Sequence, residues 1–360
     1  MKSPLAAIFL AALFSVALNA WIIAQAHYTD FVPFYAGARL AGTDRLYDRE
    51  AIIEEQTAQF GIYYPEAMNL RPPIYYTVIS PLGKLSRRTA ERVWTAVMAA
   101  AVVGFLCVYP FEKRLWLILA TAASFPIWVA VGTGQDVPLY LLAFGLALWA
   151  RSQGHNLAAG LCLSIMANKP HLILFVPLVL LLKREWSILA GMLLGGAFAL
   201  IASFGVAGLD WPAAYLGMVL DPNASPRPFL MPNYLAIADA IGLPALEYVL
   251  GFATLIMLIP VVRKLPLERA LPVALLANLL CSHHAYVADC ILVIPALLYL
   301  ASEVETELAR TVGLIALLPI FYIACLNGLG ALVAVLLAIT FMAFYFQTKP
   351  HWIAAELHSR

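Results

Sequence analysis

Residues 187–206, SILAGMLLGGAFALIASFGV, form a predominantly apolar run without a charged side chain. An apolar helix of about 20 residues is long enough to cross the hydrocarbon core of a bilayer. Similar runs recur along nearly the whole chain, which has 360 residues, 63% of them hydrophobic and 12% charged. Soluble domains are far less apolar, and the strands of a membrane β-barrel would alternate apolar and polar residues. The sequence therefore predicts an all-α polytopic membrane protein, folded as a single integral membrane domain over residues 1–360.

About twelve of these runs are predicted to cross the membrane as helices. They are residues 5–25, 90–109, 115–132, 137–150, 156–168, 170–182, 187–206, 245–262, 270–282, 286–301, 311–326 and 328–346. The stretch 72–83 is shorter and carries three prolines, so we interpret it as a re-entrant or interfacial segment. The first run is predicted to stay in the mature protein as a helix. The alternative is a signal peptide cleaved near Ala24-Gln25-Ala26.

The distribution of lysine and arginine predicts which helix ends face the cytoplasm. With the N-terminus inside, most cations fall in short inner turns, and the cluster from Lys84 to Arg92 is the main exception. The two long outer loops are then residues 27–71 and 207–244. The stretch from Leu46 to Phe60 in the first loop is predicted to be an amphipathic helix on the membrane surface. This topology predicts a multi-pass protein of the inner (cytoplasmic) membrane.

Polar residues that stand out in so apolar a chain collect on the predicted extracytoplasmic side. They are Asp30, the turn Gly134-Gln135-Asp136, the turn Asn168-Lys169-Pro170-His171, the loop 207–244, and His283-His284. Their convergence predicts a site assembled from distant parts of the sequence. The net charge of +1 gives no indication of nucleic-acid binding.

Asp30 follows the first apolar run in the stretch 27–48, HYTDFVPFYAGARLAGTDRLYD. One interpretation is that this residue only caps a surface helix. The other is that its carboxylate is a general base, because a sugar hydroxyl is a weak nucleophile at neutral pH and needs a group that accepts its proton.

Two cations near the outer side are candidates for phosphate binding. Arg71 can hold phosphate oxygens with two parallel hydrogen bonds, and Lys169 lies in a tight turn where an ammonium suits an anionic leaving group. Either side chain could instead snorkel to water. Gln135 offers a donor and an acceptor to a sugar, although its turn could equally be an ordinary one.

His283, Tyr286 and Asp289 recur at intervals of three, so they share one stripe if a helix begins by residue 283. An Asp inside an apolar span is a candidate functional residue by default. We favour a catalytic or phosphate contact here over packing, and over a metal site, for which no further well-spaced ligands are found. The five cysteines include no CxxC pair and are interpreted as small buried hydrophobes.

In order and spacing these residues resemble the polyprenyl-phosphate-dependent mannosyltransferases of glycosyltransferase family 87, membrane enzymes of the GT-C architecture. The likeness covers roughly residues 25–300. Its motifs are Asp30…Tyr35…Gly42…Leu46-Tyr47, Pro72-Pro73, Pro81-Leu82, Gly134-Gln135, Ala159-Gly160…Lys169-Pro170, Trp211…Tyr215-Leu216, Asn233 and Ser282-His283-His284…Pro295. The resemblance implies a GT-C-like bundle with juxtamembrane helices in the first outer loop.

The resemblance also implies an inverting transfer from a polyprenyl-phosphate-linked sugar, often mannose, to a glycolipid or glycan acceptor outside the cytoplasm. Asp30 would be the base, His283 and His284 would contact the reacting phosphate or sugar, and Lys169 and Arg71 would bind the donor phosphate. Sugar or acceptor contacts are expected from Gln135, Asp136, Tyr35, Asn233, Tyr286 and Asp289. No cofactor or metal is expected; the expected partners are the lipid-linked donor, the acceptor and the bilayer.

Two other classes of function stay open. A transporter or flippase of a lipid-linked sugar predicts two matching halves with broken helices and charges near the middle of the membrane, and no internal repeat is visible in the sequence. A non-catalytic partner in envelope assembly is the other alternative. The donor sugar, the linkage and the acceptor are not specified by the sequence.

Overall fold

The computed structural model describes residues 4–24, 30–61, 68–110, 114–221, 226–304 and 306–347. All regular secondary structure in these ranges is helical, so the predicted all-α class is confirmed. The α-helices are α1 (Pro4–Ile23), α2 (Phe31–Leu40), α3 (Arg49–Phe60), α4 (Pro73–Gly83), α5 (Arg87–Val108), α6 (Arg114–Ala123), α7 (Phe125–Thr133), α8 (Val137–Ser152), α9 (Asn156–Ser164), α10 (Phe175–Leu182), α11 (Trp186–Ala207), α12 (Trp211–Val219), α13 (Tyr234–Ile241), α14 (Ala245–Lys264), α15 (Leu267–Cys281), α16 (Ile294–Ser302), α17 (Glu307–Ala316), α18 (Pro319–Leu326) and α19 (Gly330–Gln347). Short 3₁₀ helices are η1 (Ile165–Asn168), η2 (Pro170–Leu172), η4 (Pro228–Leu230) and η5 (Val287–Val293).

Within the described ranges, four helices, α5, α11, α14 and α19, are long and apolar enough to cross a membrane. The pairs α6–α7 and α17–α18 raise the number to six if each pair, bent by 59° and 45°, counts as one span. The chain is therefore a multi-pass membrane protein. Twelve crossings are not confirmed, because several predicted spans are short helices or helices interrupted by 3₁₀ turns. The eight-residue α10, for example, is only about 12 Å long.

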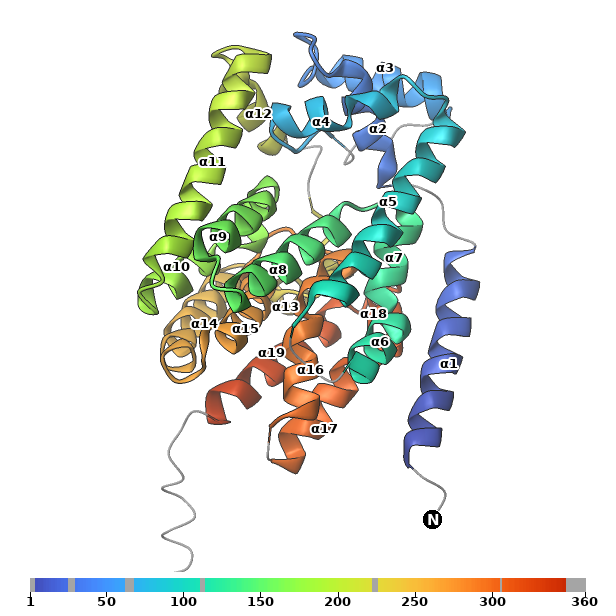
Figure 1. Ribbon diagram of the computed structural model, residues 1–360. Helices are drawn as coiled ribbons and strands as arrows, with labels where there is room; N and C mark the ends of the chain where they lie inside the picture. Colours follow the sequence, from blue (N-terminus) through green and yellow to red (C-terminus); the bar gives the residue numbers. More distant parts are fainter. Residues whose placement is uncertain are drawn as a thin grey trace, which may run out of the picture.

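Four helices, α2, α3, α4 and α12, gather at one end of the molecule, the upper end in Figure 1, and we call them the cap. Helix α3 corresponds to the helix predicted over residues 46–60. The carboxylate of Asp48 accepts from the backbone N–H of Ala51 at its start, and Gly61, with φ of 72°, ends it. Helices α2 and α4 pack closely at glycines: a Cβ on Gly83 would lie 2.8 Å from the backbone of Ala38.

Helix α4 is the segment that the sequence analysis interpreted as re-entrant or interfacial. It spans eleven residues, about 16 Å, which is too short to cross a bilayer alone. Two prolines mark its entry, at positions 72 and 73, and the second is the first helical residue. Its place in the cap (Figure 1) fits that interpretation, which stays a prediction.

The body below the cap is a bundle whose interior is occupied by α8 and α15. Helix α15 is apolar on nearly all faces and is buried along most of its length, as expected of a helix in the interior. Helices α9 and α11 touch at glycines, since a Cβ on Gly160 would lie 2.0 Å from the carbonyl oxygen of Ile188. Small residues at such crossings let membrane helices approach closely.

Helix α1 stands beside the bundle (Figure 1) and packs against α6 and α7. The amide of Asn19 is buried and donates to the carbonyl oxygen of Ala123 at the end of α6. This contact suits the predicted retained helix. The alternative cleavage site at Ala24-Gln25-Ala26 lies mostly outside the described residues.

Candidate functional site

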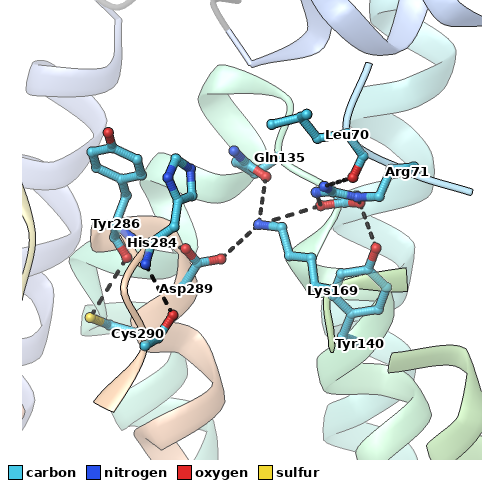
Figure 2. A network of polar contacts seen from close by, with 11 residues as sticks. Leu70, Arg71, Gln135, Tyr140, Lys169, His284, Tyr286, Asp289 and Cys290 are labelled. Carbon is cyan, nitrogen blue, oxygen red and sulfur yellow. Dashed lines mark hydrogen bonds and ion pairs between the residues drawn. The ribbon is translucent and has the colours of Figure 1, made fainter. Parts of the chain in front are cut away.

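Four charged side chains of alternating sign form a buried row beneath the cap (Figure 2). Arg71 binds Asp136 with two parallel hydrogen bonds, Nε to Oδ2 at 2.8 Å and Nη2 to Oδ1 at 3.0 Å. The ammonium of Lys169 lies 3.8 Å from Asp136 Oδ1 and donates to Asp289 Oδ1 at 2.7 Å. All four residues are less than 8% exposed. Buried charges are tolerated when they are paired in this way.

Each member of the row comes from a segment between two α-helices. Arg71 precedes the prolines that start α4, Asp136 precedes α8, Lys169 separates η1 from η2, and Asp289 lies in η5. Gly134 adopts the left-handed conformation, with φ of 83°, and so ends α7 and turns the chain towards α8. The bundle thus delivers four helix ends to one place, as the sequence analysis expected for Asp136 and Lys169.

Asp136 is enclosed by its partners. Burial raises the pKa of its carboxyl, but the charges of Arg71 and Lys169 outweigh burial and hold that pKa below its ordinary value. The hydroxyl of Tyr140 also donates to Asp136 Oδ2 at 2.6 Å. A carboxylate with this many donors and no exposed surface is suited to positioning the two cations. The predicted sugar contact of Asp136 therefore has no support from its surroundings.

Asp30 occupies the N-cap position of α2, but its side chain makes no capping hydrogen bond. Its backbone N–H instead donates to the carbonyl oxygen of Thr133 at 3.2 Å, and the side chains of Thr133 and Gln135 lie beside its carboxylate and favour the ionised form. Burial raises the pKa of this carboxyl, only partly offset by those side chains and by Lys169. The interpretation of Asp30 as a simple helix cap is thus not supported.

Gln135 connects Asp30 to the row of charges. Its Oε1 accepts from the ammonium of Lys169 at 3.3 Å (Figure 2), and its side chain also lies beside the carboxylate of Asp30. One amide therefore lies between a carboxylate and an ammonium. The structure brings Asp30, Gln135 and Lys169 together, although 139 residues separate the first from the last.

The two adjacent histidines point to different partners. The ring of His283 is 60% exposed and its Nδ1 lies 3.0 Å from a carboxylate oxygen of Glu247. His284 is turned inward, with its ring edge-to-face against Tyr286 at 5.1 Å and His171 at 6.0 Å between centroids. Burial lowers the pKa of His284 to about 4, and the charge of Lys169 acts in the same direction. His284 is therefore neutral at neutral pH.

His283, Tyr286 and Asp289 do not share a helical stripe, because no helix begins by residue 283 and runs through all three. Helix α15 ends at Cys281, and η5 begins only at Val287. The carboxylate of Asp289 reaches back to accept from the backbone N–H of Tyr286 at 2.9 Å, which fixes an extended turn between the helices. This turn lets Asp289 bind Lys169 while His283 faces outward to Glu247.

Three predicted sugar contacts already have other partners. The buried Tyr35 donates its hydroxyl to the carbonyl oxygen of Leu85 at 2.8 Å. The buried Asn233 caps α13 and donates to the carbonyl oxygen of Ser282 at 2.7 Å. The Tyr286 hydroxyl accepts from the backbone N–H of Arg227 at 3.2 Å, while its ring lies against His284. Tyr286 borders the site through its contact with His284.

The sequence analysis missed His171. Its Nε2 is buried without a hydrogen-bond partner, and its backbone oxygen accepts from the Asn278 side chain at 2.5 Å. His171 lies in the same short turn as Lys169, so the turn itself was a signal, although only its lysine was interpreted. Among the described residues no group of three or more His, Cys, Asp or Glu side chains has the arrangement of a metal site.

Comparison with known proteins places this row of charges within a defined family. The family model of glycosyltransferase family 87 matches residues 69–295, well over half of the chain. The chain belongs to glycosyltransferase family 87. It is therefore a membrane glycosyltransferase, which acts on a sugar donor and an acceptor. The matched range includes the whole row from Arg71 to Asp289, whereas Asp30 precedes it. No match was found among curated proteins or solved structures.

Proposed function

We propose that this family 87 glycosyltransferase moves a sugar, mannose in the simplest case, from a polyprenyl-phosphate donor to a glycolipid or glycan acceptor. The proposed site faces the extracytoplasmic side of the inner membrane. One observation carries the proposal: the side chain of Gln135 accepts from the Lys169 ammonium and lies beside the Asp30 carboxylate. A base and a cation for a leaving phosphate are thereby held close together beneath the cap.

The proposed reaction is a single displacement. The acceptor hydroxyl oxygen forms a bond to the anomeric carbon, its proton passes to Asp30, and the bond between that carbon and the phosphate oxygen breaks with its electron pair going to the phosphate. Attack from the face opposite the phosphate inverts the anomeric configuration. The raised pKa of Asp30 makes it a stronger base, and Lys169 stabilises the charge that develops on the leaving phosphate.

The charges of the site do not favour a phosphate by themselves. Two cations, Arg71 and Lys169, face three carboxylates, Asp30, Asp136 and Asp289. The guanidinium of Arg71 already makes two hydrogen bonds to Asp136. In our proposal Arg71 therefore positions Asp136 and, contrary to the sequence analysis, does not bind the phosphate directly. We propose that His284, and His171 beside it, gain a proton when the donor binds and so supply the missing positive charge.

Proton uptake by His284 predicts a pH dependence of donor binding. The pKa of His284 is about 4 in the free protein, and an adjacent phosphate would raise it, because an opposite charge favours the protonated form. Binding then takes up a proton, so Kd for the donor should increase as pH rises, by up to about tenfold per unit between the two pKa values. A polyprenyl-phosphate sugar is a phosphodiester, whose own charge is constant over this range.

The measurement is isothermal titration of a polyprenyl-phosphate sugar between pH 5 and pH 8, in buffers of different ionisation enthalpy so that bound protons are counted. The variant His284→Asn should flatten the dependence, while the exposed His155→Asn should leave it unchanged. A constant Kd and no proton uptake in the unaltered protein would remove His284 from the phosphate site.

The test of the function itself uses purified protein in lipid nanodiscs. Polyprenyl-phosphate sugars and nucleotide sugars are offered in turn with a panel of glycolipid acceptors, and the product's anomeric configuration is read by NMR. We expect transfer only from lipid-linked donors, with inversion. Transfer from a nucleotide sugar would refute the donor class, and retention would refute the single displacement. Movement of the donor across vesicles without any transfer would favour the flippase alternative.

A further inference from the structure

A cluster of basic residues follows α4 and opens α5, and the proposed reaction uses none of it. Residues 84–92, KLSRRTAER, hold four cations and one carboxylate. The carboxylate, Glu91, is paired with Arg87 at 3.6 Å. The side chains of the other three cations form no ion pair or hydrogen bond with any described residue, and all three residues are exposed; they are Lys84, Arg88 and Arg92. In the predicted topology this cluster lies outside the cytoplasm, so the positive-inside tendency does not account for it.

The cluster stands at one end of an apolar surface. Helix α5 is one of the described helices that are long and apolar enough to cross a bilayer, and it runs from the cap down the side of the bundle (Figure 1). One face of α5 carries Arg88, Arg92, Ala96, Ala99 and Val103, and all five are exposed. The face therefore presents two unpaired charges in its first turns and only apolar side chains further along. An anionic phospholipid has the matching order, with a phosphate at the membrane surface and acyl chains below it.

A hollow of about 330 Å³ adjoins the cluster at the ends of α2 and α4. Its lining residues are Ala38, Arg39, Ala41, Ser80, Gly83 and Lys84. Arg39 is already bound to Glu55 and to the carbonyl oxygen of Gly83. The ammonium of Lys84 and the hydroxyl of Ser80 have no such bond to a described residue. The hollow thus offers one uncommitted cation and one hydroxyl to the oxygens of a phosphate ester.

This place is separate from the candidate site. Arg71 lies before the first turn of α4 and Lys84 follows its last residue, so about 16 Å of helix separates them. The segment between α4 and α5 is tied to the cap, because Tyr35 donates to the carbonyl oxygen of Leu85 and the guanidinium of Arg87 lies 5.3 Å from the centre of the Phe60 ring. The cations are thereby held at a fixed place where α5 meets the cap.

We propose that Lys84, Arg88 and Arg92 bind the phosphate of an anionic phospholipid, whose acyl chains lie along the exposed face of α5. A soluble phosphate would make the same charge contacts but would leave the apolar face uncovered. A zwitterionic lipid would cover that face, but its own amine would oppose the three cations. Only an anionic lipid satisfies both the charges and the apolar surface. The proposal does not depend on which sugar or donor the enzyme uses.

The test compares phosphatidylglycerol with phosphatidylcholine of the same acyl chains. The protein is placed in phosphatidylcholine nanodiscs with rising fractions of phosphatidylglycerol, and lipid retained on the released protein is counted by native mass spectrometry. Removing a surface cation should weaken the tightest phosphatidylglycerol site about fivefold, so Lys84→Gln should cost about fivefold and Arg88→Gln/Arg92→Gln about 25-fold. The matched control is Arg263→Gln/Lys264→Gln, two exposed cations at the end of another predicted span, which should leave this affinity unchanged.

Three results would overturn the proposal. They are equal retention of the two lipids, equal losses in the two double variants, and displacement of the bound lipid by glycerol 3-phosphate or inorganic phosphate, which would indicate a site for a soluble anion. The Kd of the sugar donor should be the same in Arg88→Gln/Arg92→Gln as in the unaltered protein, and a loss there would assign the cluster to the donor instead. Arg92→Gln alone, with an expected loss of about fivefold, gives the same reading if the double variant does not fold.

Discussion

Asp30→Asn is expected to lower kcat by roughly 100- to 10,000-fold, because a positioned general base contributes about that much to the rate. The amide keeps the shape of the carboxylate but cannot accept the proton of the acceptor hydroxyl. Donor binding should change little, because the cations and histidines stay in place. Single-turnover transfer in nanodiscs, with a separate measurement of donor Kd, distinguishes the two effects.

The control for this prediction is Asp44→Asn, which changes another aspartate of the same loop that is exposed to solvent. Both variants remove one negative charge from the cap end of the molecule. If Asp30→Asn retained full kcat, or if both variants lost the same activity, Asp30 would not be the base. The pH profile gives an independent reading, since burial raises the pKa of Asp30 and the acid limb of kcat/KM should lie above pH 3.8.

Asp136→Asn is expected to destabilise the protein by about 3 to 5 kcal/mol, the usual cost of removing one partner of a buried ion pair. Arg71 would be left buried without its carboxylate, and Lys169 would lose one of its two acidic neighbours. Because the pKa of Asp136 is lowered in the folded state, the stability from its ionised form is present above its unfolded pKa and is lost as pH falls towards the folded value.

The measurement is denaturant unfolding in mild detergent, with Asp210→Asn as an exposed control. A double-mutant cycle with Arg71→Met tests the pairing directly. Arg71→Met should cost clearly less in the Asp136→Asn background than alone, because no charge is then left without its partner. Additive effects of the two substitutions would show that the pair is not coupled.

The candidate site was predictable where a charged residue stands alone in apolar sequence. Asp30 and Lys169 were selected because each lies between apolar runs on the predicted outer side, and Asp289 because an Asp inside an apolar span is costly. Their mutual contacts were not predictable, since they depend on how helix ends separated by 120 residues or more approach one another. Arg71 was interpreted as a phosphate ligand because a guanidinium can hold phosphate oxygens. Its actual bidentate partner, Asp136, is 65 residues away and was not predictable.

The number of spans shows a different limit of sequence patterns. Hydropathy averages over about a span's length and does not resolve a turn such as the one between η1 and η2, where Lys169 lies. It also does not show that η5 starts only at Val287, after an extended turn held by Asp289. Local hydrogen bonds determine where these helices are interrupted, and the polar side chains of the site lie at these interruptions.

The excess of carboxylates over fixed cations has a consequence for turnover. If the proposed reaction is right, a phosphodiester with one negative charge enters and a phosphate monoester with about −1.5 to −2 at pH 7 must depart. Once Asp30 has released the acceptor's proton, a pocket with three carboxylates and two permanent cations repels the spent carrier more strongly than the fresh one. We therefore expect that release of the used lipid phosphate does not limit the rate of turnover. The next donor can bind once the histidine has lost the proton that it gained with the previous one.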